Sequence, residues 1–485
     1  MSPLIILITI ICYFLILVAI AQLTGRKADN EAFFLGNKRS PWYVVAFGMV
    51  GASLSGVTFI SVPGWVGSSE FAYMQMVLGY LLGYIVVANI LMPMYYRLSL
   101  TSIYTYLDGR FGKTSYRTGA SFFLLSRVIG ASFRLFLVAN VLQFTVFDSW
   151  NVPFWVSVIV TILLIWLYTF RGGIKTIIWT DTLQTLFMLA AVLMSVIFIA
   201  RDMELDFEGV VSTIRDSDYS RWFFFDDWKD KRHFVKQFFS GMFITIVMTG
   251  LDQDMMQKNL SCKNIKEAKK NMYWFSITLV PVNLLFLSLG ALLFIYASQK
   301  GLTIPEQSDN LFPMIASGGY MGPVIAVVFI LGLIAAAYSS ADSALTALTT
   351  SFSVDILNIR KHENEEKRKR IRKLVHAMFS LILFVVILIF NSINNENVIS
   401  AIFTAAGYTY GPLLGLYAYG LFTKLPSWDQ YVPYLAIVSP CLSYLLKLGL
   451  AYWFGWQVGF ELLILNGLIT FFGLWVLYKM MPDQD

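Results

Sequence analysis

Charged residues are scarce in this chain, and their scarcity excludes most soluble folds. Asp, Glu, Lys and Arg make up 14% of the 485 residues, whereas hydrophobic residues make up 57%. The mean hydropathy is +0.65, and soluble domains have about a quarter of their residues charged. A surface this apolar could not stay in water, so we expect an integral membrane protein whose solvent is lipid.

Cysteine is scarce as well, with three residues in the whole chain. Cys12 and Cys441 lie in apolar runs and Cys262 lies in a basic loop, so no spacing points to a metal site or a disulfide framework. We therefore expect no redox cofactor. The first apolar run, 3–21, lacks a preceding basic stretch and a small-residue cleavage site, which favours a retained helix over a signal peptide.

Long apolar runs are what the chain has instead. Each covers roughly 20 residues, enough to cross about 30 Å of hydrocarbon as a helix. We predict an all-α integral membrane fold with about thirteen transmembrane helices, near 3–23, 42–66, 72–98, 117–147, 152–170, 174–200, 235–257, 272–298, 320–357, 372–391, 396–422, 430–452 and 459–479.

The distribution of Lys and Arg predicts how these helices are oriented. Alternate loops hold most of the basic residues, among them 26–39, Lys258, 263–270 and 360–373. The loop 201–232 is the exception on the other side, with six basic against nine acidic residues, and its net negative charge is compatible with the outside. The positive-inside rule then predicts an outside N-terminus and a cytoplasmic C-terminus in a bacterial-type inner membrane.

The basic stretch 361–373, with the sequence KHENEEKRKRIRK, raises the alternative of nucleic acid binding. A solvated cytoplasmic loop that fixes the topology explains the same charges. We therefore expect no nucleic-acid partner.

Small and polar residues interrupt the segment 42–66. Its middle is crowded by Gly51, Ser53, Ser55, Gly56 and Thr58. Such a stretch is a poor helix and predicts an unwound break, where free carbonyl groups can hold a cation. Close packing of helices on small residues is the alternative.

A carboxylate lies inside the segment 174–200. Asp181 and Gln184 share one helical face, about a turn or two inside the membrane. A carboxylate at that depth costs about 2.5–3.5 kcal/mol on insertion scales, so it usually has a functional partner. Pairing with Lys175 at the membrane interface is the alternative.

A stripe of hydroxyl groups runs along the segment 320–357. Its members follow i, i+3, i+4, i+7 spacing, with Asp342 beside them: Ala336, Ser339, Ser340 and Ser343. Hydroxyl, carbonyl and carboxylate oxygens suit an alkali cation rather than a transition metal. For the serines alone, close helix packing remains the alternative.

Two arginines lie in mid-helix within the segment 117–147. Arg127 and Arg134 are seven residues apart and therefore on roughly one face. Arginine cannot deprotonate, so each side chain needs an anion, a carboxylate or water. Internal ion pairing and substrate binding both remain open.

Together these stretches resemble the sodium:solute symporter family. The matching motifs are Gly172-Gly173 to Asp181 and Gln184, Ala336 to Ser340 followed by Val354-Asp355-Ile356, Tyr106 to Phe111, and Gly250 to Gln253 with Gln257. The resemblance runs from about residue 30 to 425. It implies the leucine-transporter-like fold, in which two inverted five-helix repeats surround a midplane site and the first helix of each repeat is broken.

The resemblance also implies how the chain is divided. We expect a leading helix at 1–30, a first repeat at 41–201, an inverted second repeat at 233–422 and two peripheral C-terminal helices at 423–485.

The resemblance implies sodium as the coupling ion and places its ligands. The general sodium site of the family looks like the carbonyls of Gly51, Leu54 and Ala336 with the hydroxyls of Ser339 and Ser340. A second site, present in some members, resembles one formed by Asp181, Ser339, Asp342 and Ser343. Asp342 stands where such members have a neutral hydroxyl.

Substrate residues differ among the carriers of this family. The Glu-Gln pair of the galactose carrier is Val57-Thr58 here, which argues against a hexose held in that manner. The hydroxyls of Ser53, Ser55 and Thr58 look like the triad by which sialic acid carriers hold a carboxylate, and the arginine of those carriers aligns near Gly130. The predicted substrate-binding residues are Ser53, Ser55, Thr58, Gln75, Arg127, Arg134, Thr245 and Thr404.

The resemblance therefore implies a sodium-coupled symporter that imports a small organic anion, such as a sialic-acid-like sugar acid, by alternating access. A neutral sugar or polyol is the alternative solute, and a membrane sensor is a remote alternative. We expect no signalling domain, because the chain ends at Asp485 soon after its last apolar run. No nucleophile–base spacing indicates an enzyme. The expected partners are the solute, sodium ions and the lipid bilayer.

Overall fold

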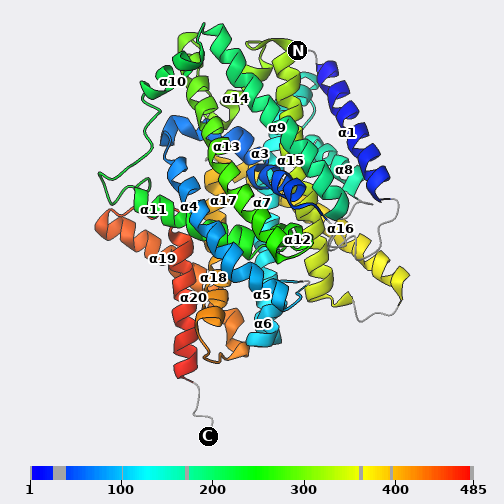
Figure 1. Cartoon of the computed structure of the whole chain (residues 1–485), viewed down its shortest axis with the longest axis vertical. Helices are drawn as coiled ribbons and strands as arrows, with labels where there is room; N and C mark the ends of the chain where they lie inside the picture. Colours follow the sequence, from blue (N-terminus) through cyan, green and yellow to red (C-terminus); the bar gives the residue numbers. More distant parts are fainter. Residues whose placement is uncertain are drawn as a thin grey trace.

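The computed structural model describes residues 3–25, 40–100, 102–169, 174–359, 364–393 and 397–480. Helices make up nearly all the regular structure in these ranges (Figure 1). The single β-type pairing among them is a bridge between Ser40 and Cys262. The predicted all-α class is confirmed.

The helices follow the predicted apolar segments closely. The longer ones are α1 (Pro3–Gly25), α3 (Trp42–Ser69), α4 (Tyr73–Val86), α7 (Lys113–Leu142), α8 (Phe154–Thr169), α9 (Ile174–Asp202), α11 (Phe234–Thr245), α13 (Ile265–Gln299), α15 (Gly322–Ser351), α16 (Glu365–Ile393), α17 (Val398–Thr409), α18 (Gly411–Phe422), α19 (Val432–Phe454) and α20 (Leu462–Lys479). The shorter ones are α5 (Met92–Arg97), α6 (Thr105–Arg110), α10 (Phe207–Arg215), α12 (Gln253–Leu260) and α14 (Leu311–Ser317).

Fewer helices in the described ranges are long enough to span a membrane than the sequence pattern predicts. Within the described ranges, nine helices are long and apolar enough to cross a membrane, or ten if the bent pair Phe234–Gly250 and Gln253–Leu260 is one span. Shorter apolar helices at Ile6–Ile20, Phe154–Trp166, Val398–Thr409 and Gly411–Phe422 occupy the other predicted segments. The protein is thus a multi-pass membrane protein, but the count of thirteen is not confirmed.

The predicted break in the segment 42–66 is present in α3. Ser55 has φ 50° and ψ 174°, a conformation that interrupts the helix at its middle. A non-glycine residue held at positive φ costs about 1–3 kcal/mol and persists only where its surroundings enforce it. The backbone groups beside Ser55 are therefore released from regular helical bonding inside the protein.

A second break divides the segment 235–257. After Thr245 the chain forms a π-helical turn, Ile246–Gly250, and then bends by 67° into α12. The side chain of Asp252 caps α12 by accepting hydrogen bonds from the backbone N–H groups of Asp254 and Met255. The two broken helices are those expected to begin the two repeats, whereas the repeat boundaries at 41–201 and 233–422 remain a prediction.

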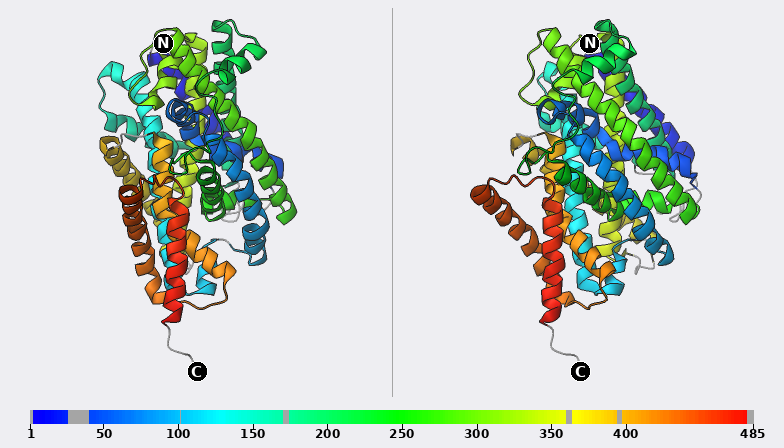
Figure 2. Two further views of the ribbon diagram at one scale, coloured as in Figure 1. Left: turned by 90° about the vertical axis from the view of Figure 1, so that its left-hand side faces the viewer. Right: turned by 60° about the vertical axis from the view of Figure 1, so that its left-hand side comes forward.

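The broken helix α3 lies in the interior, where it packs against α9, α13 and α15. Its contact with α9 is close, because a Cβ added to Gly51 would lie 2.1 Å from the hydroxyl of Thr185. The leading helix α1 lies on one side of the molecule, and α19 and α20 lie on the opposite side (Figures 1 and 2). The polar residues at the break in α3 therefore lie in the middle of the bundle, between α9, α13 and α15, and not on either side.

Two charged features are not where the sequence analysis places them. Lys258 is predicted in a cytoplasmic loop, which is wrong, because α12 carries it into the interior and leaves it 1% exposed. The basic stretch is likewise predicted as a loop. Its described part, from residue 365 onward, instead forms the first turns of α16.

Candidate functional site

A small cavity of about 90 Å³ lies beside the break in α3, and we call it the central chamber. It collects six of the eight predicted substrate residues: Ser53, Ser55, Thr58, Arg127, Arg134 and Thr245. Three tyrosines of α4 and three apolar side chains of α17 complete much of its wall: Tyr73, Tyr80, Tyr84, Ile399, Ile402 and Phe403. Polar groups on α3, α7 and α11 thus converge in one place.

The positive charge of Arg127 is neutralised by two carboxylates inside the protein. Its guanidinium lies 2.5 Å from a carboxylate oxygen of Asp254 and 3.4 Å from one of Asp252. Tyr410 donates a further hydrogen bond to the same oxygen of Asp252, at 3.0 Å. Internal ion pairing, one of the two alternatives left open by the sequence, therefore describes Arg127.

Arg134 is in a different position two turns along the same helix. Its side chain lines the central chamber and is only partly buried. Among the residues that the structure describes, no carboxylate lies within ion-pair distance of its guanidinium. Arginine remains charged at any ordinary pH, so this wall of the chamber presents a fixed positive charge.

A second buried ion pair lies on the residues of the predicted second cation site. The ammonium of Lys258 is 2.9 Å from one carboxylate oxygen of Asp181, and both side chains are about 1–2% exposed. The hydroxyl of Ser339 donates to the other oxygen of Asp181, at 2.6 Å. Three elements, α9, α12 and α15, meet at this carboxylate.

The remaining members of that site lie next to it on α15. Asp342 and Ser343 are fully buried, and Asp342 accepts a hydrogen bond from the backbone N–H of Ser343 at 2.5 Å. The hydroxyl of Ser343 and the amide group of Gln184 are buried without a hydrogen-bond partner in the described structure. Polar oxygens are therefore concentrated on this face of α15.

The residues of the predicted first cation site also come together. The hydroxyl of Ser340 lies 3.4 Å from the backbone oxygen of Ala52, across the gap between α15 and α3. Close approach of the same two helices at Gly56 and Ala337 holds them in register, because a Cβ on Gly56 would lie 3.2 Å from that of Ala337. Carbonyls of α3 near the break thus face hydroxyls of α15.

Two predicted substrate residues lie outside the central chamber. The amide group of Gln75 donates to the backbone oxygen of Arg232, at 2.9 Å, and accepts from the backbone N–H of Phe224, so it ties the loop 216–233 to α4. Thr404 lines a larger cavity of about 390 Å³, the peripheral pocket. A helical segment fixes how deep a residue lies but not which side of the helix faces the site.

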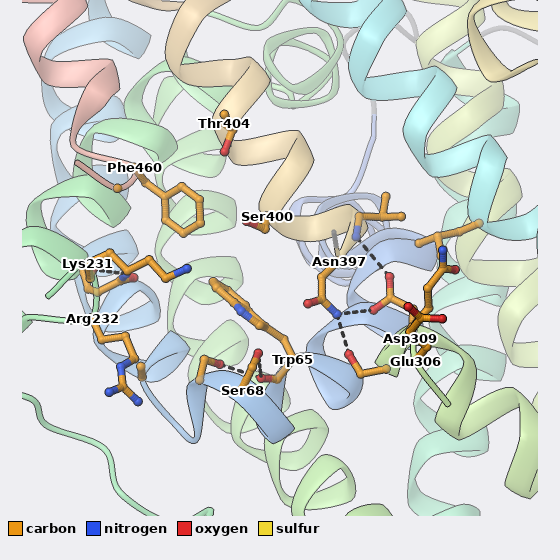
Figure 3. Close-up of a pocket in the computed structure, with 18 of the residues that line it drawn as sticks. Trp65, Ser68, Lys231, Arg232, Glu306, Asp309, Asn397, Ser400, Thr404 and Phe460 are labelled. Carbon is orange, nitrogen blue, oxygen red and sulfur yellow. Dashed lines mark hydrogen bonds between the residues drawn. The ribbon is translucent and has the colours of Figure 1, made fainter. Parts of the chain in front are cut away.

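The peripheral pocket has walls of opposite charge (Figure 3). Lys231 and Arg232 lie on one side, and Glu306 and Asp309 lie on the other. Asp309, which lies between two spans, accepts hydrogen bonds from Asn397, Ser61 and the backbone N–H of Val398. Burial nevertheless raises the pKa of Asp309 above its usual range, against the effect of these donors.

Four aromatic rings separate the peripheral pocket from the central chamber. Tyr73 and Phe403 line the chamber, with ring centroids 6.4 Å apart, and Trp65 and Phe460 line the pocket, 5.9 Å apart. The pairs are joined by contacts of 5.8 Å between Trp65 and Tyr73 and 5.2 Å between Phe403 and Phe460. A solute passing between the two cavities would have to displace this layer.

Sequence reasoning missed the charged groups of α12. Arg127 binds Asp252 and Asp254, and Asp181 binds Lys258. The motif from Gly250 to Gln253 with Gln257 gives the two carboxylates no role, and the charge pattern places Lys258 in a loop. The available signal was the presence of two carboxylates, Asp252 and Asp254, near the end of the apolar segment 235–257, with Lys258 directly after it.

The amino-acid sequence of this chain is similar to those of known transport proteins. A sequence profile of the sodium:solute symporter family matches residues 33–425. The sodium/sialic acid symporter NanT of Aliivibrio fischeri is 25% identical over 418 residues, which cover 82% of this chain and 79% of that protein. SiaT of Proteus mirabilis, also a sodium/sialic acid symporter, is 24% identical over 82% of this chain and 80% of its own. The human sodium/iodide cotransporter is 24% identical over 82% of this chain and 62% of its own.

Solved structures confirm the predicted leucine-transporter-like fold. A Na⁺-coupled sialic acid symporter in a substrate-bound outward-open state superposes with a TM-score of 0.81 at 21% identity, over 99% of this chain and 98% of that one. A nucleobase-cation-symport-1 family transporter in a closed conformation gives a TM-score of 0.59 at 15% identity, over 94% and 97%.

Proposed function

This chain belongs to the sodium:solute symporter family, and we propose that the solute it imports with sodium is a small organic anion. A sialic-acid-like sugar acid is first among the candidates. The observation that carries the proposal is Arg134, a charged guanidinium on the chamber wall with no carboxylate partner in the described structure. A guanidinium can hold a carboxylate through two parallel hydrogen bonds.

The hydroxyls around the break in α3 would complete the recognition of such a solute. Ser53, Ser55 and Thr58 line the chamber beside Arg134, and Thr245 faces them from α11. Hydroxyl groups both donate and accept hydrogen bonds, so they suit the carboxylate and the ring hydroxyls of a sugar acid alike. The two bacterial relatives named above, which carry sialic acid, support this assignment.

Sodium would bind at the first cation position, between the break in α3 and the hydroxyl stripe of α15. Its proposed ligands are the carbonyls of Gly51, Leu54 and Ala336 with the hydroxyls of Ser339 and Ser340. The approach of Ser340 to the backbone oxygen of Ala52 supports this position. Sodium bound there would hold α3 and α15 together, and release of sodium and solute on the other side would complete alternating access.

The proposal also includes the orientation of the chain in the membrane. With the N-terminus outside and the C-terminus in the cytoplasm of a bacterial-type inner membrane, the peripheral pocket opens to the outside. Its lysines, Lys231 and Lys447, would then lie on the entry route of an anionic solute. The aromatic layer below them would act as the barrier between that route and the chamber.

Uptake by purified protein in proteoliposomes tests the proposal. With sodium outside, we expect radiolabelled sialic acid to accumulate, and we expect no accumulation without a sodium gradient. Unlabelled sialic acid should compete, whereas its methyl ester should compete roughly 10–100-fold less. That factor corresponds to a lost charged hydrogen bond of about 1.5–3 kcal/mol.

The runner-up solute, a neutral sugar or polyol, gives the opposite result. If galactose or the methyl ester competes as well as the acid, the carboxylate is not recognised. The assignment of Arg134 would then be wrong.

A further inference from the structure

The ion pair between Lys258 and Asp181 lies where the resemblance places a second sodium ion. Asp181 and Ser339 are two of the predicted ligands of that position, and they bind each other through one oxygen of the carboxylate. The other oxygen lies 2.9 Å from the ammonium of Lys258. A positive charge therefore already stands within hydrogen-bonding distance of the acidic ligand.

The ammonium of Lys258 is buried among carboxylates, as a bound cation would be. Lys258 is 1% exposed and Asp181 is equally buried, so neither side chain is in contact with bulk solvent. Asp254 lies one turn before Lys258 on α12, and Asp342 lies about one turn after Ser339 on α15, so two further carboxylates belong to the elements that meet at the ion pair. A sodium ion at the same position would lie close to that ammonium, and two like charges in a buried site repel each other strongly.

We propose that the ammonium of Lys258 occupies the second cation position as a tethered cation, so that a single sodium ion, bound at the first position, accompanies each solute. Asp342 fits this assignment. The resemblance gives a neutral hydroxyl at its place, and an added carboxylate strengthens the hold on a cation that never leaves the chain. The proposal rests on the proposed function for its solute, but not for its ion count.

The number of sodium ions bound by the purified protein tests this directly. Equilibrium binding of radiolabelled sodium, measured without any solute, should give one ion per chain in the native protein. Lys258→Met removes the charge and keeps most of the side-chain length, so it should raise the count to two. Lys258→Arg keeps a cation at the position and should leave the count at one.

The ion count of the native protein tests the proposal even if Lys258→Met fails to fold, because two ions in the native protein would overturn it, and a double variant serves as the control. The double variant Lys258→Met with Asp181→Asn removes both charges of the pair, so no buried carboxylate is left uncompensated there. It lacks both the tethered cation and the acidic ligand for a replacement, and it should bind one ion. Two ions in the native protein, or one ion in a folded Lys258→Met variant, would overturn the proposal and leave Lys258 a structural residue.

The dependence of uptake on membrane potential tests the number of transported sodium ions independently. One sodium ion with one monovalent anion moves no net charge, so uptake by the native protein should not respond to an imposed membrane potential. Uptake by Lys258→Met with two sodium ions should increase when the interior is made negative. If sialic acid is not a solute at all, this arm fails while the ion count stands, which separates the two proposals.

Discussion

In the described part of this molecule, cationic side chains are paired with carboxylates in one region and line open cavities without a carboxylate partner in another. Around α12, every cation that reaches the interior has a carboxylate, because Arg127 binds Asp252 and Asp254 and Lys258 binds Asp181. Arg134 on the wall of the central chamber, and Lys231 and Lys447 at the peripheral pocket, have no carboxylate within ion-pair distance among the described residues. Arg232, which also lines that pocket, is the exception, because it pairs with Glu70 and Asp230. We call these two groups the paired region and the open region.

The difference separates structural charge from charge available to a ligand. An ion pair in the interior is costly to break, since removal of one partner leaves the other buried and uncompensated. A cation without a partner can instead be matched by an anion that enters and leaves. Residues of one type on one helix, Arg127 and Arg134, can therefore serve different purposes because of what α12 brings to one of them.

The largest effect is expected from breaking the paired region. Arg127→Met should destabilise the protein by about 3–5 kcal/mol, because Asp252 and Asp254 lose their counter-charge. Thermal unfolding in detergent measures this, and Arg134→Met is the matched control, for which we expect a change of about 1 kcal/mol or less. Equal losses in the two variants would show that both arginines are structural.

The next effect is expected from the open region and concerns transport rather than stability. Arg134→Lys keeps the charge but not the two parallel hydrogen bonds to a carboxylate. We expect uptake of the anion at low concentration to fall roughly 10–100-fold, in line with a loss of about 1.5–3 kcal/mol. Arg127→Lys, assayed in parallel, should lower uptake less. Normal transport by both lysine variants would contradict the carboxylate assignment.

A smaller effect is expected where sodium would join α3 to α15. Ser340→Ala removes one proposed oxygen ligand, and we expect the sodium concentration for half-maximal uptake to rise about tenfold, or about 1.4 kcal/mol. Ser195→Ala is a suitable control, because Ser195 is also fully buried but donates to a carbonyl of its own helix, that of Ala191. An unchanged sodium dependence in Ser340→Ala would mean that the first site is misplaced.

The sequence predicted the broken helix because a break is a local property. Glycine and serine in the middle of an apolar segment disfavour regular helix, and the structure places the break at Ser55, within that stretch. The hydroxyl stripe of α15 was equally visible, because helical spacing alone puts Ser339 and Ser340 on one face. Features set by neighbours along the chain were therefore predictable.

Features that depend on contacts between distant segments could not be predicted from the sequence. Charge counting treats a lysine that follows a span as a loop residue, but the 67° bend before α12 turns Lys258 back into the interior. The partners of Arg127 depend on the same bend. Thr404 lies next to Phe403 of the chamber wall but lines the peripheral pocket, because the pattern does not fix the direction of a side chain around its helix. Gln75 lies in the first turn of α4, where it binds the loop 216–233 instead of lining the chamber.

The smallest effect is expected at the mouth of the open region. Replacing Lys231 and Lys447 together by glutamine removes two positive charges that line the peripheral pocket. Charges at the rim of a site act mainly on the association rate of a charged ligand and lose influence as salt screens them. We expect uptake of the anion at low concentration to fall roughly two- to fivefold at low ionic strength. The loss should nearly vanish above about 0.3 M salt, where screening acts over a few ångströms.

Lys300→Gln is the matched control, because Lys300 is exposed but paired with Asp202 at 2.7 Å. A loss that persists at high salt, or an equal loss in Lys300→Gln, would show that the two lysines do not attract the solute from a distance.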